Sequence, residues 1–476
     1  MAVADPLAAK LPTRKLPKAP KLRRLLGPSF ILLGLGLGSG EIILWPYLAS
    51  NYGLGIIWGA VIGITFQFFM NMEIERYALA RGESIFVGFA RKLRWLPVWF
   101  IVATFVPWMW PGIISSSVAM FSHVFGIPAQ YTIHLTVGLL VLIGLILSLG
   151  PSLYRTVERF QKTLIFIGVP SIFVICLLIA QPTDYTSLAQ GVVGIGDGYF
   201  LLPAGIALTS FLAALAYSGA GGNLNLSQSY YIKEKGFGMG KYSGRITSVL
   251  TGSRDNKPLM TGSQFATSDK SQIREFRRWW RVINTEHALV FWGMGVLTIL
   301  LLSLLAFATN YGSHPASGDI SFVIAEAAAI GQSLTPAVGT FFLVVLGLMM
   351  FATQLTVYDS VSRIMAENVV LASRGRLNER RIPLVYYSLL WGIIGAAIAV
   401  TLSGFTQPLQ LLITSAIMNA IAMFVHAGLT LWLNRTSLPR PIRPNAWRTV
   451  AMIGAVLFYG GFSIFIVATE LQKLIS

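Results

Sequence analysis

Residues 27–46 read GPSFILLGLGLGSGEIILWP, an apolar run that is interrupted by Gly38-Ser39-Gly40 and carries one carboxylate, Glu41. Apolar residues flank this carboxylate for longer than a soluble core helix needs, which places it at the depth of a lipid bilayer. An ionisable group there costs about 2.5 kcal/mol or more and marks a binding site or a pathway by default. The glycines offer a point where a spanning helix opens and turns its backbone groups inward.

Composition predicts a membrane protein. The chain has 476 residues, of which 54% are hydrophobic and only 12% are charged, whereas soluble domains carry about 25% charged residues. The net charge of +17 does not indicate nucleic acid, because the basic residues lie in short loops between apolar segments. The one cysteine, Cys176, lies inside an apolar segment, so we expect neither a disulfide framework nor a thiolate metal site. We expect an all-α polytopic membrane protein with a lipid bilayer as its surroundings and no nucleic acid partner.

Eleven apolar segments are long enough to cross a bilayer, since a transmembrane helix needs ~17–25 such residues. Two prolines, Pro107 and Pro111, should kink the third segment. Residues 1–26, rich in proline and lysine, are predicted to form a disordered basic cytoplasmic arm. The predicted spans are 27–50, 54–72 (extended to 82), 95–121, 131–149, 164–180, 199–232, 284–309, 335–358 (extended to 372), 383–402, 409–433 and 447–469.

The basic residues test this topology. With the N-terminus in the cytoplasm, all but one of the 36 Lys and Arg residues fall in inside segments, and only Lys473 falls outside. A missed or extra span would invert every later loop, so the positive-inside rule supports the order of spans. The chain is therefore expected to be integral to the plasma membrane, with its N-terminus in the cytoplasm and its C-terminus outside.

Two of the eleven spans are interrupted by glycine at mid-depth. The sixth breaks at Ser218-Gly219-Ala220-Gly221-Gly222, five spans after the break at residues 38–40, and crosses in the opposite direction. Broken helices at corresponding positions of two halves indicate an inverted-repeat transporter with its site between the breaks. Small residues that only permit close helix packing are the alternative, but they do not account for the polar residues Glu41, Asn223 and Asn225 beside the breaks.

This pattern predicts the organisation of the chain. Residues 27–180 should form the first inverted repeat, residues 199–433 the second, with a cytoplasmic loop at 233–283, and residues 446–470 an eleventh span. The predicted substrate-binding residues lie at the breaks and on the eighth span; they are Gly38, Ser39, Gly40, Glu41, Ser218, Gly219, Ala220, Gly222, Asn223, Asn225 and Gln354.

At these residues the chain resembles the Nramp family of divalent-metal transporters, which have the leucine-transporter-like fold. The match runs without a gap from GPSF at Gly27 through Tyr52-Gly53 and Trp58 to Arg81-Gly82. Weaker similarity follows at GNLNLSQS (222–229), at QLTVYDSVSRIMAEN (354–368) and near the end at LPRPIRPNAWR and FYGGFS. The resemblance implies the family's fold and a role in transport.

The chain departs from the family where the family binds its metal. The family's Asp-Pro-Gly-Asn motif, whose Asp and Asn ligate the ion, is replaced by the four residues 38–41, so Glu41 stands at the Asn position. The family's Met-Pro-His aligns with residues 220–222, and Asn223 keeps the Asn that often follows. The family's proton-route carboxylates have no counterpart, because residues 95–122 contain no acid. Neither the family's metal ligands nor its proton coupling can be carried over.

The remaining groups leave two substrates open. Without the thioether of methionine, the carboxylate, amides and freed carbonyls form an all-oxygen site, with Glu41 and Asn223 as candidate metal ligands. Such a site suits a hard, partly hydrated cation such as Mg²⁺ or Ca²⁺, or a monovalent ion, and Mn²⁺ is a further divalent candidate. Alternatively, backbone N–H groups at the glycines could bind the carboxylate of an amino acid or another zwitterion, with its ammonium group near Glu41. A coupling cation stays open as a further partner.

Other candidates have simpler explanations. Asp359 and Arg363 are four residues apart on one helix face and form either an inner gate or a structural ion pair. Glu73, Glu75 and Arg76 are expected to pair with one another or with neighbours. Asn419 is expected either to hydrogen-bond to a neighbouring helix or to act as a ligand. The five histidines show no i,i+4 pair, so no histidine metal site is expected.

The cytoplasmic loop indicates neither an enzyme nor a cofactor site. Its three glycines at alternate positions from 236 to 240 resemble a linker more than a nucleotide site, and no P-loop, nucleophile elbow or HExxH motif is present. Residues 268–281, with an Arg-rich face and Trp279 and Trp280, are predicted to form an interfacial helix. We therefore expect a symporter-like secondary transporter that is not an enzyme and uses no cofactor, with an ion channel as the rival class.

Overall fold

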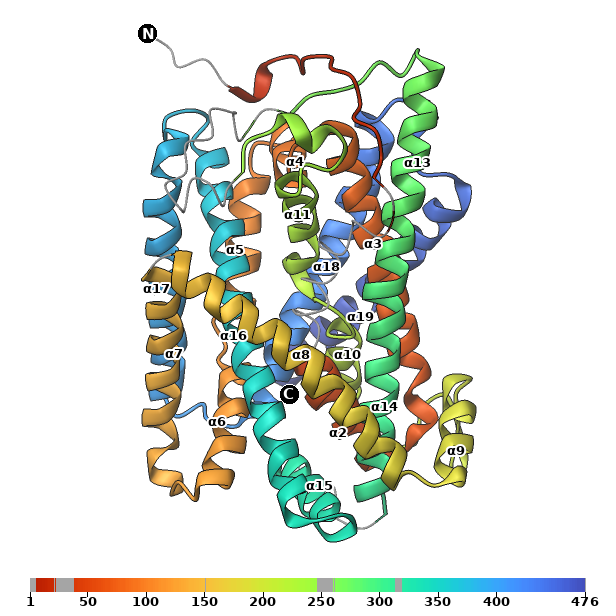
Figure 1. The fold of residues 1–476 in the computed structure, drawn as a ribbon, viewed down its shortest axis with the longest axis vertical. Coiled ribbons are helices and arrows are strands. Elements are labelled where there is room, and N and C mark those ends of the chain that lie inside the picture. Colours follow the sequence, from red (N-terminus) through yellow and green to blue (C-terminus); the bar gives the residue numbers. More distant parts are fainter. Residues whose placement is uncertain are drawn as a thin grey trace.

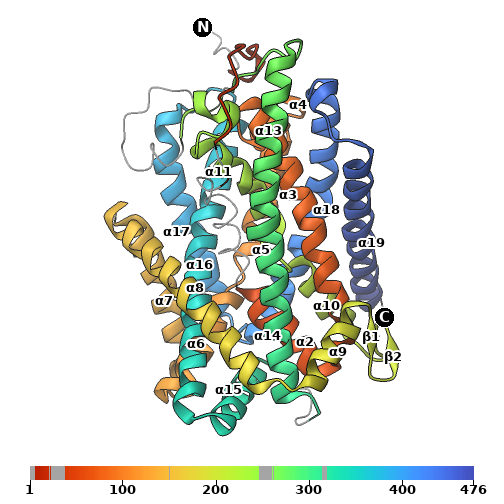
Figure 2. The same ribbon diagram turned by 45° about the vertical axis from the view of Figure 1, so that its right-hand side comes forward.

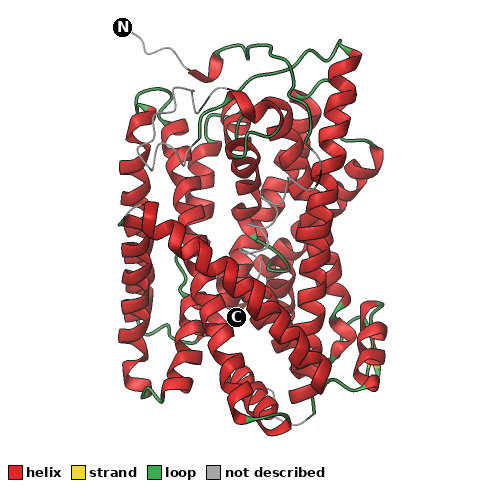
Figure 3. Cartoon of the chain, viewed as in Figure 1, coloured by secondary structure: helices red, strands yellow, loops and turns green. Residues whose placement is uncertain are grey.

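The chain is helical almost throughout (Figure 3). The computed structural model describes residues 6–20, 22, 38–149, 151–245, 260, 262–312 and 319–475; for 151–162, 164, 165 and 470–475 it describes the backbone only. The helices are α2 (Trp45–Tyr52), α3 (Trp58–Arg81), α4 (Ile85–Lys92), α5 (Leu96–Trp108), α6 (Gly112–Phe125), α7 (Thr132–Ser148), α8 (Pro151–Ile179), α9 (Pro182–Val192), α10 (Leu208–Ala216), α11 (Gln228–Glu234), α13 (Lys270–His287), α14 (Met294–Asn310), α15 (Ser321–Ser333), α16 (Pro336–Ala372), α17 (Ile382–Leu402), α18 (Pro408–Ser437) and α19 (Ala446–Ile475).

Eight helices in the described part of the chain are long and apolar enough to cross a membrane, and the bent pair Phe166–Ile179 and Pro182–Val192 is a ninth candidate. These nine correspond to the predicted spans other than the first and the sixth, which are the two predicted to be broken. Residues 27–37 of the first span lie outside the described residues. The all-α polytopic class is therefore confirmed. The predicted kink is confirmed as well, since α5 ends at Trp108 and α6 begins at Gly112.

The helices lie side by side with their long axes mostly along one direction, and α8 crosses them obliquely (Figure 1). The N-terminal arm, α4 and the start of α13 lie at one end of the molecule, and α9 and α15 lie at the other. α19 lies at the edge of the bundle against α18 and α3 (Figure 2). One continuous apolar core joins residues from nearly every helix, from Ile42 to Ile466.

The sixth span begins later than its apolar composition predicts. Residues near 199 form a short antiparallel hairpin of β1 (Ile195–Gly196) and β2 (Tyr199–Phe200), and α10 begins only at Leu208. Pro203 lacks a backbone N–H and Gly205 has a positive φ of 78°, so neither favours a helix between the hairpin and α10. Apolar character alone did not distinguish this connection from a helix.

The predicted interfacial helix is wrong in its orientation. α13 covers this stretch, but it continues through a π-helical turn, η8 (Ala288–Gly293), into α14 as one helix of 41 residues, Lys270–Asn310. Its apolar face, which includes Ile273, Phe276 and Trp279, is buried in the protein rather than laid on lipid. The amphipathic pattern was read correctly as a helix with two faces, but its partner is the rest of the chain.

The N-terminal arm is not disordered over residues 6–20. Thr13 forms a parallel bridge with Gln264, and Leu16 N–H donates to Gln272 Oε1 of α13 at 2.7 Å. Trp279 Nε1 donates to the carbonyl oxygen of Pro17 at 2.7 Å, and Leu7 and Leu16 are buried. The expectation of a disordered arm is therefore wrong for this stretch, while residues 1–5 and 23–26 lie outside the described residues.

Candidate functional site

The sixth span is interrupted at the predicted glycines. α10 ends at Ala216, and the chain resumes as a 3₁₀ helix, η6 (Gly222–Ser227), which leads into α11. Gly221 and Gly222 have φ values of 72° and 54°, a left-handed conformation that costs other residues free energy. From the break, α10 extends toward the end of the molecule where α9 lies. α11 extends toward the opposite end, where the N-terminal arm lies (Figure 1).

The first break lies directly against the second. The first span continues from Gly38 as a π-helical turn, η3 (Gly40–Leu44), followed by α2. A Cβ atom on Gly40 would overlap the carbonyl oxygen of Tyr217, and one on Gly38 would lie 2.9 Å from Thr353 Oγ1 on α16. Trp45 Nε1 also donates to Ser218 Oγ at 3.0 Å. The structure therefore brings the two predicted breaks together, with the eighth span beside them.

One side chain that the sequence analysis missed caps the second break. Gln67 of α3 is fully buried; its Nε2 donates to the carbonyl oxygen of Ala216 at 3.1 Å, and its Oε1 accepts from Gly221 N–H at 3.3 Å. A single amide thus supplies partners to both sides of the interruption. Gly219 packs against the same side chain, since a Cβ there would lie 2.7 Å from Gln67 Oε1.

Glu41 is buried at the first break. Its side chain is 1% exposed, and its Oε2 lies 3.5 Å from the backbone nitrogen of Gly38, which donates to it. Ser39 between them and Ala220 on the other break are buried as well. Burial of a carboxylate costs solvation free energy unless the carboxylate is paired or hydrogen-bonded. The 3.5 Å contact with the backbone of Gly38 offsets little of this cost. Glu41 is therefore the charge at this site that a cation would stabilise.

Buried amide oxygens surround the break in the sixth span. Asn223 Nδ2 donates to Thr104 Oγ1 of α5 at 3.0 Å, while Asn223 Oδ1 has no partner among the described residues. Asn225, fully buried, makes no side-chain hydrogen bond within the described part of the chain, and Gln354 Oε1 also has no partner there. Buried polar atoms are rarely left unpaired in native proteins. The two candidate metal ligands therefore form hydrogen bonds with different residues: Glu41 with Gly38, and Asn223 with Thr104.

A polar stripe on α18 completes the site and was largely missed. Asn419 Nδ2 donates to the Tyr217 hydroxyl at 2.9 Å, and Ser415 Oγ lies 2.6 Å from the same hydroxyl. His426 Nε2 lies 3.1 Å from the carbonyl oxygen of Gly222. These residues recur four and seven positions apart, as residues on one helix face do, and this spacing was the available signal. Asn419 lies at the second break, where its Oδ1 would clash with a Cβ on Gly222.

The candidate gate at Asp359 and Arg363 is a partly buried network. Arg363 Nε donates to Asp359 Oδ1 at 3.0 Å, and Tyr386 of α17 donates its hydroxyl to the same oxygen at 2.7 Å. Arg363 Nη1 also lies 3.5 Å from Glu234 Oε1, at the end of α11. The pair therefore links α16 and α17 to α11, the half of the sixth span that follows the break, which suits both a structural role and a gate.

The donor set limits the chemistry of the site. Among the described residues, no group of three or more His, Cys, Asp and Glu side chains is placed to hold a metal ion. The two breaks instead offer one carboxylate and several amide, hydroxyl and carbonyl oxygens. Such oxygen ligands suit hard cations that keep part of their hydration shell, Mg²⁺ and Ca²⁺ above all.

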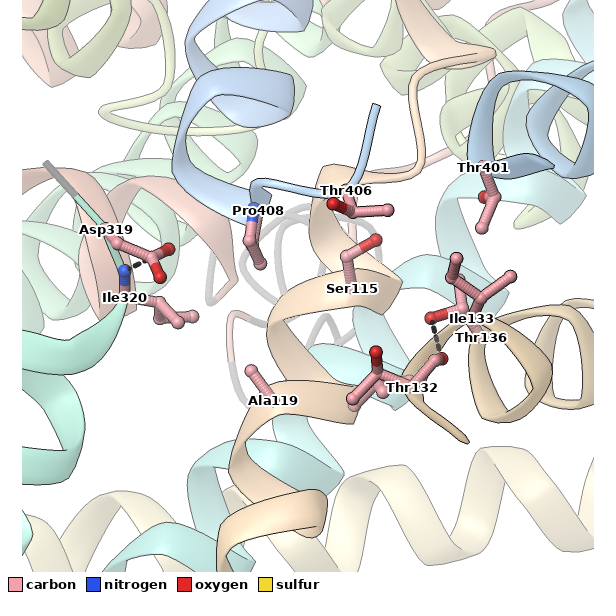
Figure 4. Close-up of a pocket in the computed structure, with 11 residues that line it drawn as sticks. Ser115, Ala119, Thr132, Ile133, Thr136, Asp319, Ile320, Thr401, Thr406 and Pro408 are labelled. Carbon is pink, nitrogen blue, oxygen red and sulfur yellow. Dashed lines mark hydrogen bonds between the residues drawn. The ribbon is translucent and has the colours of Figure 1, made fainter. Parts of the chain in front are cut away.

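A separate pocket of about 120 Å³ lies among α6, α7 and the segments before α15 and α18 (Figure 4). Asp319 and five hydroxyl groups line it, but most of these groups have internal partners. Thr136 donates to Thr132 O, Thr401 donates to Ala397 O, and Asp319 Oδ1 accepts from Ile320 N–H. No residue of the two breaks lines this pocket, so we assign it no role in substrate binding.

Comparison with solved structures identifies the fold. The chain is similar to the crystal structure of a mutant of the manganese transporter from Eremococcus coleocola, with a TM-score of 0.65 and 13% identity over 98% of this chain and 91% of that one. A complex of the same transporter with an aromatic bis-isothiourea substituted compound gives a TM-score of 0.59 at 13% identity, covering 99% and 92%. No protein-family model matches the chain, and no curated protein sequence does.

At 13% identity this similarity shows the fold alone. The protein is an all-α polytopic membrane protein with the leucine-transporter-like fold, as the resemblance to the Nramp family implied. Membership of the Nramp family, which rests on the motifs of the first two spans, stays a prediction.

Proposed function

We propose that this protein is a secondary active transporter that moves a hard divalent cation across the membrane by alternating access. The observation that carries the proposal is the direct contact between the two broken spans beside one buried carboxylate, Glu41. Sites between broken helices at mid-membrane are typical of transporters with inverted repeats. The solved proteins of the same fold include a manganese transporter, which supports transport of a divalent ion.

The contacts at the breaks favour a cation over a zwitterion. A substrate carboxylate would need free backbone N–H groups, but Gly38 N–H faces Glu41 and Gly221 N–H faces Gln67 Oε1. Three of the glycines also pack closely against neighbouring groups rather than facing open space. A Cβ on Gly40, Gly219 or Gly222 would meet Tyr217, Gln67 or Asn419 at less than van der Waals distance. The amide oxygens that have no hydrogen-bond partner among the described residues are suited to coordinate a cation.

The site contains no thioether among its proposed ligands, so its selectivity should differ from that of a sulfur-containing site. Oxygen ligands alone favour Mg²⁺, Ca²⁺ and Mn²⁺ over softer ions such as Cd²⁺. In the proposal Glu41 supplies the negative charge that binds the cation. Asn223, Asn225 and Gln354 supply neutral oxygen ligands while the site alternates between the two sides of the membrane. The Asp359–Arg363 network would hold α11 in place on the inner side until the substrate is released.

The proposal includes the expected topology. The N-terminus would lie in the cytoplasm and the C-terminus outside the plasma membrane, with residues 27–180 and 199–433 as the two inverted repeats. The loop at 233–283 and the ordered arm would then share the cytoplasmic end of the molecule.

A ligand screen tests the proposed substrate. The purified full chain in proteoliposomes is assayed for uptake of Mg²⁺, Ca²⁺ and Mn²⁺ with ion-sensitive dyes, and by calorimetry for binding of the same ions and of amino acids. Saturable uptake of at least one of these ions with counterflow supports a cation carrier. Binding of an amino acid without response to any ion would instead establish the zwitterion alternative, and ohmic single-channel currents would establish a channel.

A further inference from the structure

A second buried polar cluster lies away from the two breaks, toward the N-terminal arm. It combines Glu75 of α3, Gln228 of α11, His287 and Glu286 of α13, and Arg448 of α19. The first four of these side chains are 7% exposed or less, and none belongs to the substrate site proposed above. Four helices therefore meet at a carboxylate that substrate binding does not use.

Glu75 is the centre of this cluster. Gln228 Nε2 donates to Glu75 Oε1, and His287 Nδ1 lies 3.5 Å from the same oxygen. Glu75 Oε2 has no hydrogen-bond partner among the described residues. The imidazole of His287 is stacked between Phe68 and Phe291, with ring centroids 5.5 and 4.8 Å away. Among the described residues, the printed hydrogen-bond and ion-pair partners of Glu75 are therefore one amide and one imidazole, and the imidazole is held between two aromatic rings.

The nearby arginines are committed to another carboxylate. Arg76 Nε donates to Glu73 Oε2 at 2.8 Å, and Arg448 Nη1 lies 3.6 Å from Glu73 Oε1. Arg448 Nη2 also donates to Asn284 Oδ1. The charged groups that face Glu75 from the elements packed on it are Glu286 of α13, which repels its charge, and Arg448 of α19, which attracts it. Within the described part of the chain, Glu73 is thus paired with arginines, whereas the basic group in contact with Glu75 is the imidazole of His287.

We propose that Glu75 is the binding site of a coupling proton, and that Gln228 transmits its protonation state to the broken span. The proton adds to Glu75 Oε2 and converts the carboxylate to a neutral carboxyl group, with no other bond made or broken. Gln228 is the first residue of α11, the half of the sixth span that follows the break. Since hydrogen bonds to an ionised carboxylate are about twice as strong as neutral ones, protonation loosens the contact between α11 and α3.

The donors around Glu75 suit a proton better than a metal ion. An amide nitrogen and an imidazole nitrogen already face Glu75 Oε1, and no group of metal-ligating side chains of the required size occurs among the described residues. A carboxyl group with a free oxygen can accept a proton without displacing either contact. This inference rests on the proposed transport function, for which it names the coupling ion.

Hydrogen–deuterium exchange of residues 223–235 tests the site without any substrate. The purified full chain is compared between about pH 5 and about pH 8, since buried carboxyl groups titrate across this range, after correction for intrinsic exchange rates. We expect about fivefold weaker protection of this segment at low pH. Glu75→Gln, which carries no charge, should show the weaker protection at every pH, and Glu75→Asp should keep the pH dependence.

The matched control is Glu326→Gln, which alters a different buried carboxyl group, on α15, and should exchange like the wild type. A wild-type protein without pH-dependent protection of this segment would overturn the proposal even if Glu75→Gln did not fold. Wild-type pH dependence retained in Glu75→Gln would overturn it as well.

A flux assay then tests coupling. Proteoliposomes loaded with a pH-sensitive dye should acidify inside when external Mn²⁺ drives uptake, and Glu75→Gln should abolish the acidification. Mn²⁺ uptake by the wild type without acidification contradicts coupling at Glu75. Absence of uptake of every ion tested would contradict the transport function instead, and the exchange result would still decide whether Glu75 controls α11.

Discussion

Gly40 shows how a residue can be required by its neighbour rather than by its own conformation. Its backbone is helical, but a Cβ atom there would overlap the carbonyl oxygen of Tyr217. The sequence predicts that this glycine helps to open a helix, and in the structure it also allows two broken spans to touch. Which atom it meets could not be predicted, because Tyr217 lies far away in the sequence.

Substitution of this glycine should therefore destabilise the protein. Gly40→Ala forces the two breaks apart, and overpacking of this kind costs ~1–3 kcal/mol. A lower midpoint of thermal unfolding in detergent checks the prediction. Gly392→Ala on α17 is the matched control, because a Cβ there meets no atom within 4 Å. Equal midpoints for the two variants would show that the breaks are not in contact.

Gln67 makes the second prediction at this scale. Gln67→Leu removes the hydrogen bonds to Ala216 O and from Gly221 N–H and leaves both backbone groups buried and unpaired, which costs ~1–3 kcal/mol each. We expect faster amide exchange in residues 216–222 than in the wild type. The exposed Gln410→Leu serves as the control, and unchanged exchange in the Gln67 variant would contradict the capping role.

At the scale of elements, hydropathy predicted the uninterrupted spans because twenty apolar residues have few alternatives to a membrane helix. It failed for the start of the sixth span, where apolar residues form a hairpin and a loop. It also failed for α13, whose apolar face covers protein instead of lipid. The periodicity of apolar residues predicts that a helix has an apolar and a polar face. It does not predict whether the apolar face packs against lipid or against protein.

The N-terminal arm gives the clearest failure of composition. A stretch rich in proline and lysine was expected to be disordered, yet two leucines are buried and distant backbone groups hold the chain. Leu16 is the residue to test. Burial of a leucine contributes about 1.5–3 kcal/mol, which corresponds to roughly tenfold or more in the population of the released arm.

Leu16→Glu should therefore accelerate tryptic cleavage at Lys15 about tenfold or more in the purified protein. The exposed Ala9→Glu is the control for added charge. Equal cleavage rates for wild type and Leu16→Glu would show that the arm is not docked through this leucine.

At the scale of the whole molecule, two broken spans set five spans apart predicted inverted repeats, and the resemblance to the Nramp family predicted the leucine-transporter-like fold. The similarity to a solved manganese transporter confirmed that fold. The proposed substrate site was predicted from Glu41 and the glycines, which stand at the two breaks that the structure brings into contact. On α18, the stripe of Ser415, Asn419 and His426 faces this proposed site. Of the three, only Asn419 was singled out from the sequence as a possible ligand, because the residues are isolated in an apolar stretch. Only the packing of α18 on both halves of the sixth span brings them to the break.

The proposed orientation predicts labelling from one side only. In a Cys176→Ser background, a cysteine at the exposed Ser333 should react with a membrane-impermeant maleimide in intact cells. A cysteine at the exposed Arg376 should react only after permeabilisation. The reverse pattern would place the N-terminus outside and would contradict the topology.

Glu41 tests the central claim most directly. Glu41→Gln keeps the size of the side chain and removes the charge of the one carboxylate in residues 27–46, so we expect at least about a hundredfold loss of Mn²⁺ uptake in proteoliposomes. Thermal unfolding and gel filtration establish that the variant is folded, and Glu326→Gln should transport like the wild type. Wild-type uptake by a folded Glu41→Gln protein would contradict a cation site at the two breaks.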